Sequence, residues 1–342
     1  MIQCNVKYYT LLFFTTILMF FCGCCSECDI DRELPQSTNY STSLTLACWI
    51  KDLELQQIVD NFNAQNESCK IEIYAFFDPE DPNDDVEIAL KRMSVELMSG
   101  SQPDLFYLES MDVMSLVNAN LLLDLMPFIE SDVTINDTKY YTNIWSLFEH
   151  NNKLFEFIPC YQVAGVVGSR ALLNNQDKWT LDSYTSFVKE TGQSINLDRS
   201  VLLAYMIQFS LDEFIDIESG VCSFDTEAFL DWIYFLDQFP ERSPDTSQIY
   251  PILLWGIADY KNIIDVLGTQ PKILGYPSIS GDNPCAMALS SFAISSNTSY
   301  KEECWTFLKF LLDIDVQTTI FRNIGFPISK DAMDASVKPD PV

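Results

Sequence analysis

Strand-like and helix-like segments alternate along the first part of this chain, and that order restricts the sheet they can form. Residues 44–50, 70–76 and 104–108 are short apolar or alternating runs typical of strands, and residues 53–66 and 86–99 between them are amphipathic. A helix between two neighbouring strands returns the chain to the end where the first strand began, so the strands run parallel. The sequence therefore predicts an α/β domain with a mainly parallel sheet flanked by helices.

The pattern is interrupted at two extended segments, one containing Pro159 and the other containing Pro277. Each block between these segments carries strands and helices of its own, and the chain after its N-terminal part is long enough for two domains. We therefore expect two lobes, each a mainly parallel sheet flanked by helices, joined by strands that cross between them.

The balance of charge argues against one class of partner. The chain has 20 basic and 49 acidic residues, which gives a formal net charge of −29. An acidic surface of this kind repels phosphate backbones, so we expect no nucleic-acid partner.

The N-terminal residues have the pattern of an export signal. Lys7 precedes an apolar run at residues 8–21, which is short for a spanning helix of roughly 20 residues. Gly23 and Cys24 follow, and they resemble the lipobox of bacterial lipoproteins, in which the cysteine is acylated. We therefore expect lipidation at Cys24, with an uncleaved signal anchor as the alternative. Residues 24–43 are polar and are expected to form a tether.

The cysteines of the folded part lie singly along the chain, without the close paired spacing of a zinc site. Most of them sit in apolar runs, where a free cysteine behaves as a small buried hydrophobe. We therefore expect free thiols. If a disulfide forms, Cys48 and Cys69 are the expected pair, because they flank two strands that should be neighbours.

Seven short motifs occur in order along residues 44–335. They read FNAQN at 62–66, SGSQPDL at 99–105, LDLMPF at 123–128, KLF with IP at 153–159, WTLD at 179–182, AIS to WTFL at 293–308 and GFP at 325–327. In this combination they resemble the family 1 extracellular solute-binding proteins, the maltose-binding-protein type that serves ABC importers. The departures from the family pattern are Asn152 in place of glycine, Ser183 in place of an acid and Cys304 in place of alanine.

The resemblance implies a periplasmic-binding-protein-like fold, in which a ligand lies in the cleft between two lobes that close by a hinge. The expected parts are a lipoprotein signal peptide (1–23), the tether (24–43), a first lobe (44–158 and 278–311) and a shortened second lobe (159–277 and 312–342). The implied function is that of a monomeric, membrane-tethered subunit on the outer face of the bacterial cytoplasmic membrane. It would capture a sugar or oligosaccharide and dock on the transmembrane permease subunits. A non-sugar solute such as a polyamine is the alternative.

Sugar recognition requires flat aromatic faces for C–H patches and planar polar groups for hydroxyls. Open α/β sheets bind ligands at the carboxyl ends of their strands, and the crossings border the same cleft. The expected ligand-binding residues at these places are Trp49, Asp52, Tyr107, Asp112, Tyr161, Gln162, Trp255 and Tyr276, and Glu109 follows the third strand in the same way. The alternative for each aromatic residue is core packing, and for each acid it is an exposed loop. Trp145, Trp179, Trp232 and Trp305 are expected to be structural.

The sequence shows no recognisable set of catalytic residues. His150 is the single histidine and lies in a polar run, and the chain has no HExxH motif, nucleophile elbow or phosphate-binding glycine loop. A glycosidase needs two placed carboxylates, and 49 acids offer no selective pair. We therefore expect no catalysis, cofactor or metal. A surface glycosidase and a structural surface lipoprotein are the less favoured classes, and the latter would not need two lobes.

Overall fold

The computed structural model describes residues 42–100, 102–216, 221–239, 241, 246–281, 283, 285–288 and 290–337. The expected signal peptide, the lipidation site at Cys24 and nearly all of the tether lie outside these residues. None of the helices in the described ranges is long and apolar enough to cross a bilayer.

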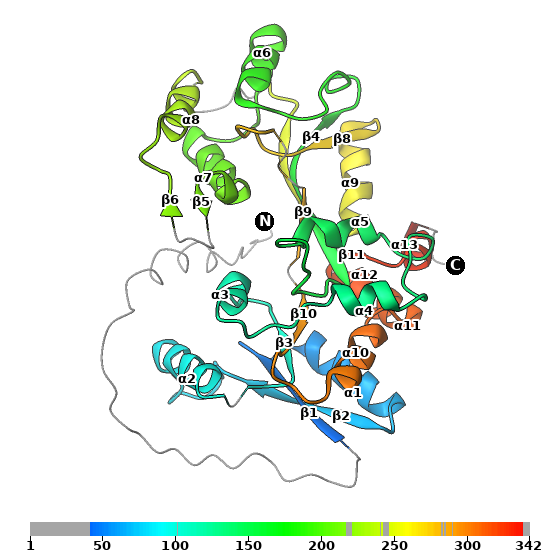
Figure 1. The fold of residues 1–342 in the computed structure, drawn as a ribbon. Coiled ribbons are helices and arrows are strands. Elements are labelled where there is room, and N and C mark those ends of the chain that lie inside the picture. Colours follow the sequence, from blue (N-terminus) through cyan, green and yellow to red (C-terminus); the bar gives the residue numbers. More distant parts are fainter. Residues whose placement is uncertain are drawn as a thin grey trace. The chain divides into compact units, whose positions relative to one another are not determined.

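The first sheet orders its strands β10–β3–β1–β2 (Figure 1). Its strands are β1 (Thr42–Cys48), β2 (Cys69–Ala75), β3 (Leu105–Tyr107) and β10 (Phe292–Ile294). β1 pairs in parallel with β2 and with β3, whereas β10 is antiparallel to β3. The connecting helices are α1 (Leu53–Gln65) and α2 (Val86–Met98), as the sequence predicts.

The local sequence explains where α1 begins and which side it buries. Asp52 caps the helix, because its carboxylate accepts a hydrogen bond from Leu55 N at 2.6 Å. The buried side includes Ile58 and Phe62. Leu53 is 85% exposed, because at 100° per residue it lies roughly 180° around the helix from Phe62.

The second sheet is built around the long strand β4. Its strands are β4 (Cys160–Ser169), β7 (Tyr250–Leu254), β8 (Pro271–Leu274), β9 (Ala286–Met287) and β11 (Phe326–Pro327). Each of the other strands is antiparallel to β4, so the expectation of a mainly parallel second sheet is wrong. Both β7 and β8 pair with β4 at Val166 and Val167, so β4 lies between them. The helix between β7 and β8 lets those two strands run parallel to each other. The local sequence does not show that β4 lies between them.

Further helices cover the sheets and the chain segments between them (Figure 1). They are α3 (Val113–Asn118), α4 (Met126–Ser131), α5 (Thr142–Trp145), α6 (Leu181–Thr191), α7 (Arg199–Phe209), α8 (Glu227–Asp237), α9 (Ile257–Leu267), α10 (Lys301–Phe310), α11 (Ile314–Val316), α12 (Arg322–Ile324) and α13 (Lys330–Val337). A π-helical stretch, Gln317–Phe321, lies between α11 and α12, and β5 (Ile215–Asp216) with β6 (Val221–Cys222) forms a small hairpin.

Side chains at the N-terminus cap α6 and α8 but not α10. Thr180 caps α6, with its hydroxyl accepting from Ser183 N at 3.2 Å. Thr226 caps α8, with its side chain accepting a hydrogen bond from Phe229 N. α10 begins after Tyr300 without a side-chain cap.

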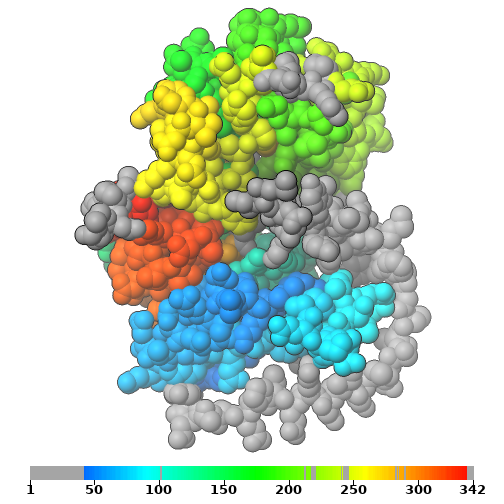
Figure 2. All heavy atoms as spheres, turned by 180° about the vertical axis from the view of Figure 1, so that it is seen from behind, coloured from blue at the N-terminus to red at the C-terminus, as the bar shows by residue number. Residues whose placement is uncertain are grey.

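Three clusters of buried side chains form the core. The first contains Phe62 of α1 and Trp305 of α10, the second lies among α6, α7 and α8, and the third lies between the first sheet and α2. The four tryptophans expected to be structural are buried. Leu312 and Phe321 also pack in the first cluster, and Figure 2 shows the orange and red surface of this segment bordering the blue surface of α1 and β2. The sequence analysis assigned residues 312–342 to the second lobe, whereas Leu312 and Phe321 pack against side chains of the first. The lobe boundaries as a whole stay a prediction.

The chain passes between the sheets at three places. The first is at Pro159 as predicted, since Phe157 bridges to Phe292 of the first sheet and β4 begins directly afterwards. The second lies between Met287 and Phe292 and not at Pro277, because Met287 pairs in the second sheet and Phe292 in the first. β9 and β10 are therefore two strands in different sheets, although only a few residues separate them. The third lies at β11, which pairs with the start of β4.

The described cysteines are free thiols, as expected. Cys48 lies opposite Ala75 and Cys69 lies opposite Thr42, so the two cysteines sit at opposite ends of neighbouring parallel strands. At about 3.3 Å per residue they are roughly 20 Å apart, far beyond the reach of a disulfide. The Cys48–Cys69 pairing is therefore excluded.

Candidate functional site

The carboxyl edge of the first sheet presents a stacked aromatic pair. Trp49 follows β1 and Phe77 follows β2, and their rings lie 5.6 Å apart at an interplanar angle of 25°. Trp49 is only 8% exposed, because Phe77 and its neighbours cover it, whereas Phe77 is half-buried. Sequence reasoning named Trp49 but missed Phe77, although the argument used for the ends of β1 and β3 applies equally to the end of β2.

A group of hydrogen-bonded polar side chains lies at the end of β3. The Tyr107 hydroxyl donates to Glu109 Oε2 at 2.6 Å and lies 3.3 Å from Ser290 Oγ. Burial raises the pKa of Glu109, the Tyr107 hydrogen bond opposes that shift, and the negative charge of Asp52 adds to it. Tyr107 itself is 3% exposed, so it does not present a stacking face. Its place in the structure is that of a residue that orients the Glu109 carboxyl group.

A second carboxyl group, that of the half-buried Glu156, lies next to the first crossing. It accepts a hydrogen bond from Ser291 Oγ at 2.9 Å, and burial raises its pKa. The backbone N–H of Leu108 donates to Ser291 O at 2.8 Å, which joins the end of β3 to the second crossing. Sequence reasoning missed Glu156, Ser290 and Ser291, because no local pattern shows that the two crossings meet at this edge.

The remaining acids of the predicted set serve as helix caps. Asp112 is exposed and caps α3, with Ser115 N at 3.2 Å from Oδ1 and Ser115 Oγ at 2.6 Å from Oδ2. Asp52 caps α1. Capping leaves carboxylate lone pairs available, so each can still accept a hydrogen bond from a ligand.

At the start of β4 the two predicted residues differ in their surroundings. Tyr161 is half-buried and stacks on Phe326, with ring centroids 5.6 Å apart, and burial raises the pKa of its hydroxyl to about 12. Gln162 is buried and donates from Nε2 to Ile324 O of α12. The Gln162 amide thus links the start of β4, at the first crossing, to the segment just before β11, at the third crossing.

The two aromatic residues predicted from the second lobe also differ. Trp255 follows β7 and is 48% exposed, and its backbone N–H donates to Asp259 Oδ2 at 2.8 Å. Tyr276 is 3% exposed and stacks on Tyr205 and Phe209, with ring centroids 5.2 and 5.3 Å away. Tyr276 therefore packs in the second core and not at a crossing, whereas Trp255 offers an open face.

A cavity of about 450 Å³ lies elsewhere in the first lobe. Its lining includes Asn66 near the start of β2, Tyr140, Lys309 and Phe310. None of the predicted ligand residues lines it, so it is distinct from the carboxyl edge of the sheet. Within the described residues, no group of three or more histidine, cysteine, aspartate or glutamate side chains is arranged to hold a metal ion.

Comparison with known proteins shows the fold. No family model matches the chain, and no curated protein matches its sequence. The structure is similar to that of the sugar-binding protein MalE from Xanthomonas citri, with a TM-score of 0.55 and 13% identity over 85% of this chain and 80% of that chain. It is also similar to a family 1 extracellular solute-binding protein from Alicyclobacillus acidocaldarius, with a TM-score of 0.52 and 12% identity over 88% of this chain and 82% of that chain. The chain thus has the α/β fold of these solute-binding proteins, as its motifs predicted.

Proposed function

We propose that this protein is the solute-binding subunit of an ABC importer, held outside the cytoplasmic membrane, and that it captures a sugar or oligosaccharide. The observation that carries the proposal is the composition of the carboxyl edge of the first sheet. The aromatic pair Trp49–Phe77 lies at this edge together with the hydrogen-bonded carboxyl groups Glu109 and Glu156. Aromatic faces and hydrogen-bonding groups side by side fit the apolar and hydroxyl surfaces of a pyranose ring.

The fold supports the same proposal. One similar structure is described as a sugar-binding protein and another as an extracellular solute-binding protein. In our proposal Trp255 and Tyr161 contribute from the second lobe and the crossing, and Asp52 and Asp112 accept hydroxyl hydrogen bonds. Ligand stabilises the closed arrangement of the lobes, and the permease recognises that arrangement. The carboxyl groups act as hydrogen-bonding groups and carry out no chemistry.

A thermal-shift screen tests the proposal. A ligand that binds only the native state at 100 times its Kd stabilises it by about 2.7 kcal/mol, so the melting temperature rises. We expect a shift with at least one maltose-, xylose- or glucosamine-based oligosaccharide, followed by a calorimetric Kd, and no shift with spermidine. A shift with spermidine alone would replace the sugar by a cationic solute. Chromatography of the incubated oligosaccharides should return them unchanged, and turnover lost in a Glu109→Gln variant would favour a glycosidase.

The membrane attachment has its own test. We expect Cys24 to be acylated, so Cys24→Ala should release the protein into the soluble fraction and abolish incorporation of a radiolabelled fatty acid. A Cys24→Ala protein that stays membrane-bound and a wild type that carries no label would indicate a signal anchor instead.

A further inference from the structure

We propose that Arg92 is a positioning residue that sets the ring of Phe77 against Trp49. The inference rests on the proposed function, because the aromatic pair is the surface on which we place the ligand. Arg92 is not part of the aromatic pair, and it acts on the pair through the backbone.

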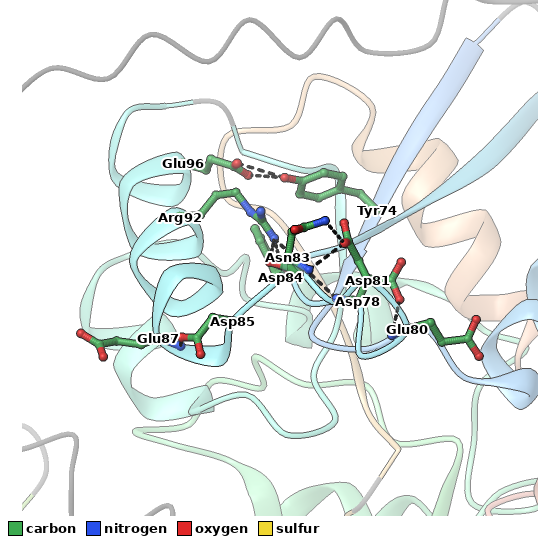
Figure 3. A network of polar contacts seen from close by, with 11 residues as sticks. Tyr74, Asp78, Glu80, Asp81, Asn83, Asp84, Asp85, Glu87, Arg92 and Glu96 are labelled. Carbon is green, nitrogen blue, oxygen red and sulfur yellow. Dashed lines mark hydrogen bonds and ion pairs between the residues drawn. The ribbon is translucent and has the colours of Figure 1, made fainter.

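Arg92 lies on α2, and its guanidinium group reaches into the loop that follows β2 (Figure 3). Nη2 donates to the backbone oxygen of Phe76 and lies 3.3 and 3.2 Å from the two carboxylate oxygens of Asp84. Asp84 Oδ2 in turn accepts from Asp78 N at 2.9 Å. The guanidinium group thus joins Phe76, at the start of the loop, to Asp84, near its end.

The contact with Phe76 fixes one peptide unit at both ends. The C=O of Phe76 and the N–H of Phe77 belong to the same planar peptide group. Its oxygen accepts from Arg92, and its N–H donates to Trp49 O at 2.9 Å. Because the plane cannot rotate without breaking one of these bonds, the direction in which Phe77 leaves the backbone is set. The stacking of its ring on Trp49 follows from that direction.

The electrostatics of the loop make a cation at this position necessary. The acidic side chains along residues 78–87 are Asp78, Glu80, Asp81, Asp84, Asp85 and Glu87. Asp84 has a largely buried side chain, and Arg92 is its ion-pair partner. Without that cation, the largely buried Asp84 carboxylate would lose its ion-pair partner among like charges, which favours opening of the loop to hydrate it.

A second contact between α2 and β2 provides a matched control. The Tyr74 hydroxyl donates to Glu96 at 2.8 and 3.0 Å, one helical turn beyond Arg92 (Figure 3). This contact also holds the helix to the strand, but it does not involve the peptide group that carries Phe77. Removing it should affect the stability of the lobe without moving the aromatic pair.

The experiment uses the full chain labelled with 5-fluorotryptophan, with the ¹⁹F resonance of Trp49 assigned by Trp49→Phe. In Arg92→Met we expect this resonance to shift and broaden while that of Trp305 stays in place. We also expect the affinity for the oligosaccharide found in the screen to fall about tenfold, which corresponds to ~1.4 kcal/mol. Arg92→Lys, which can still donate to Phe76 and pair with Asp84, should restore most of the wild-type spectrum. Tyr74→Phe should change neither the spectrum nor the affinity.

The inference is overturned if Arg92→Met leaves the Trp49 resonance unchanged, or if Tyr74→Phe shifts it equally. If Arg92→Met does not fold, Arg92→Gln replaces it, because its shorter, neutral side chain loses the ion pair with Asp84 and the guanidinium bond to Phe76 O. An unchanged Trp49 resonance in that variant would overturn the inference. If the wild type binds no carbohydrate, the proposed function fails, and the ¹⁹F spectra still decide the role of Arg92.

Discussion

The Tyr107 hydroxyl donates to Glu109 Oε2 across 2.6 Å, at the point where β3 ends. The two residues are two positions apart in the sequence. The end of the strand therefore places the Glu109 carboxyl group at the edge of the sheet, and the Tyr107 hydroxyl orients it. Tyr107 is thereby removed from the set of stacking residues and becomes a support for the group beside it.

Tyr107→Phe should weaken ligand binding while leaving the fold intact. The ring still fills its buried place, but Glu109 loses the hydrogen bond that holds its position and lowers its pKa. We expect the affinity to fall about 3- to 10-fold, the range of one hydrogen bond. Calorimetry at several pH values checks this, and an unchanged Kd across that range would contradict it.

Phe77→Ala and Trp305→Ala should separate binding from stability. Phe77 is half-buried at the sheet edge, so its loss should lower the affinity by on the order of 1–3 kcal/mol with a modest change in melting temperature. Trp305 is buried against Phe128 and Phe157, and its loss should destabilise the fold by about 3–5 kcal/mol. If Phe77→Ala unfolds the lobe and the residual folded protein binds normally, the aromatic pair is part of the core.

Glu156→Gln should change how stability depends on pH. Burial raises the pKa of Glu156 above its unfolded value, so the group contributes stability below the unfolded pKa of 4.5 that is lost as pH rises through the folded pKa. The amide cannot ionise, and it can still accept from Ser291. We expect the variant to melt higher than the wild type at pH 7, and we expect this difference to be smaller at pH 4. Melting curves with the exposed Glu67→Gln as control check it, and parallel curves would count against it.

Asp132→Asn should act in the opposite direction. The Thr134 hydroxyl and the nearby Lys309 hold the pKa of Asp132 at about 2, below its unfolded value of 3.8. Its contribution is therefore present above pH 3.8 and lost as pH falls toward 2. We expect Asp132→Asn to destabilise by about 1–3 kcal/mol at pH 7 and by much less near pH 2. Denaturant titrations at both pH values, with exposed Glu130→Gln alongside, decide it; a constant difference would be the contrary result.

Gln317→Leu should destabilise the junction of the crossings. Gln317 is fully buried; its Nε2 donates to Pro159 O at 3.0 Å and Leu311 O at 2.7 Å, and its Oε1 accepts from Ser329 N at 3.1 Å. Leucine would leave these backbone groups without that partner, at about 1–3 kcal/mol for each group that water cannot reach. Exposed Gln57→Leu on α1 is the matched change. Equal unfolding free energies for the two variants would show that the amide is not needed.

Local sequence determined the elements that depend on local physics. The strands β1 to β3 and the helices α1 and α2 between them follow from hydrophobic periodicity. The edge argument also placed Trp49, Asp52 and Glu109 at the ends of their strands, because parallel strands end on one side. Where a residue's role depends on its own segment, a single sequence was sufficient.

Tertiary structure decided everything that depends on which segments meet. The antiparallel position of β4 between β7 and β8, and the crossing between Met287 and Phe292, depend on strand partners far apart in the chain. Tyr276 looks like a cleft residue in the sequence, but it stacks on Tyr205 and so belongs to the core. The contact of Arg92 with Phe76 joins a helix to the end of a strand. Periodicity shows which face of a segment is apolar, but it does not show what covers that face, because burial is a property of the partner as much as of the segment.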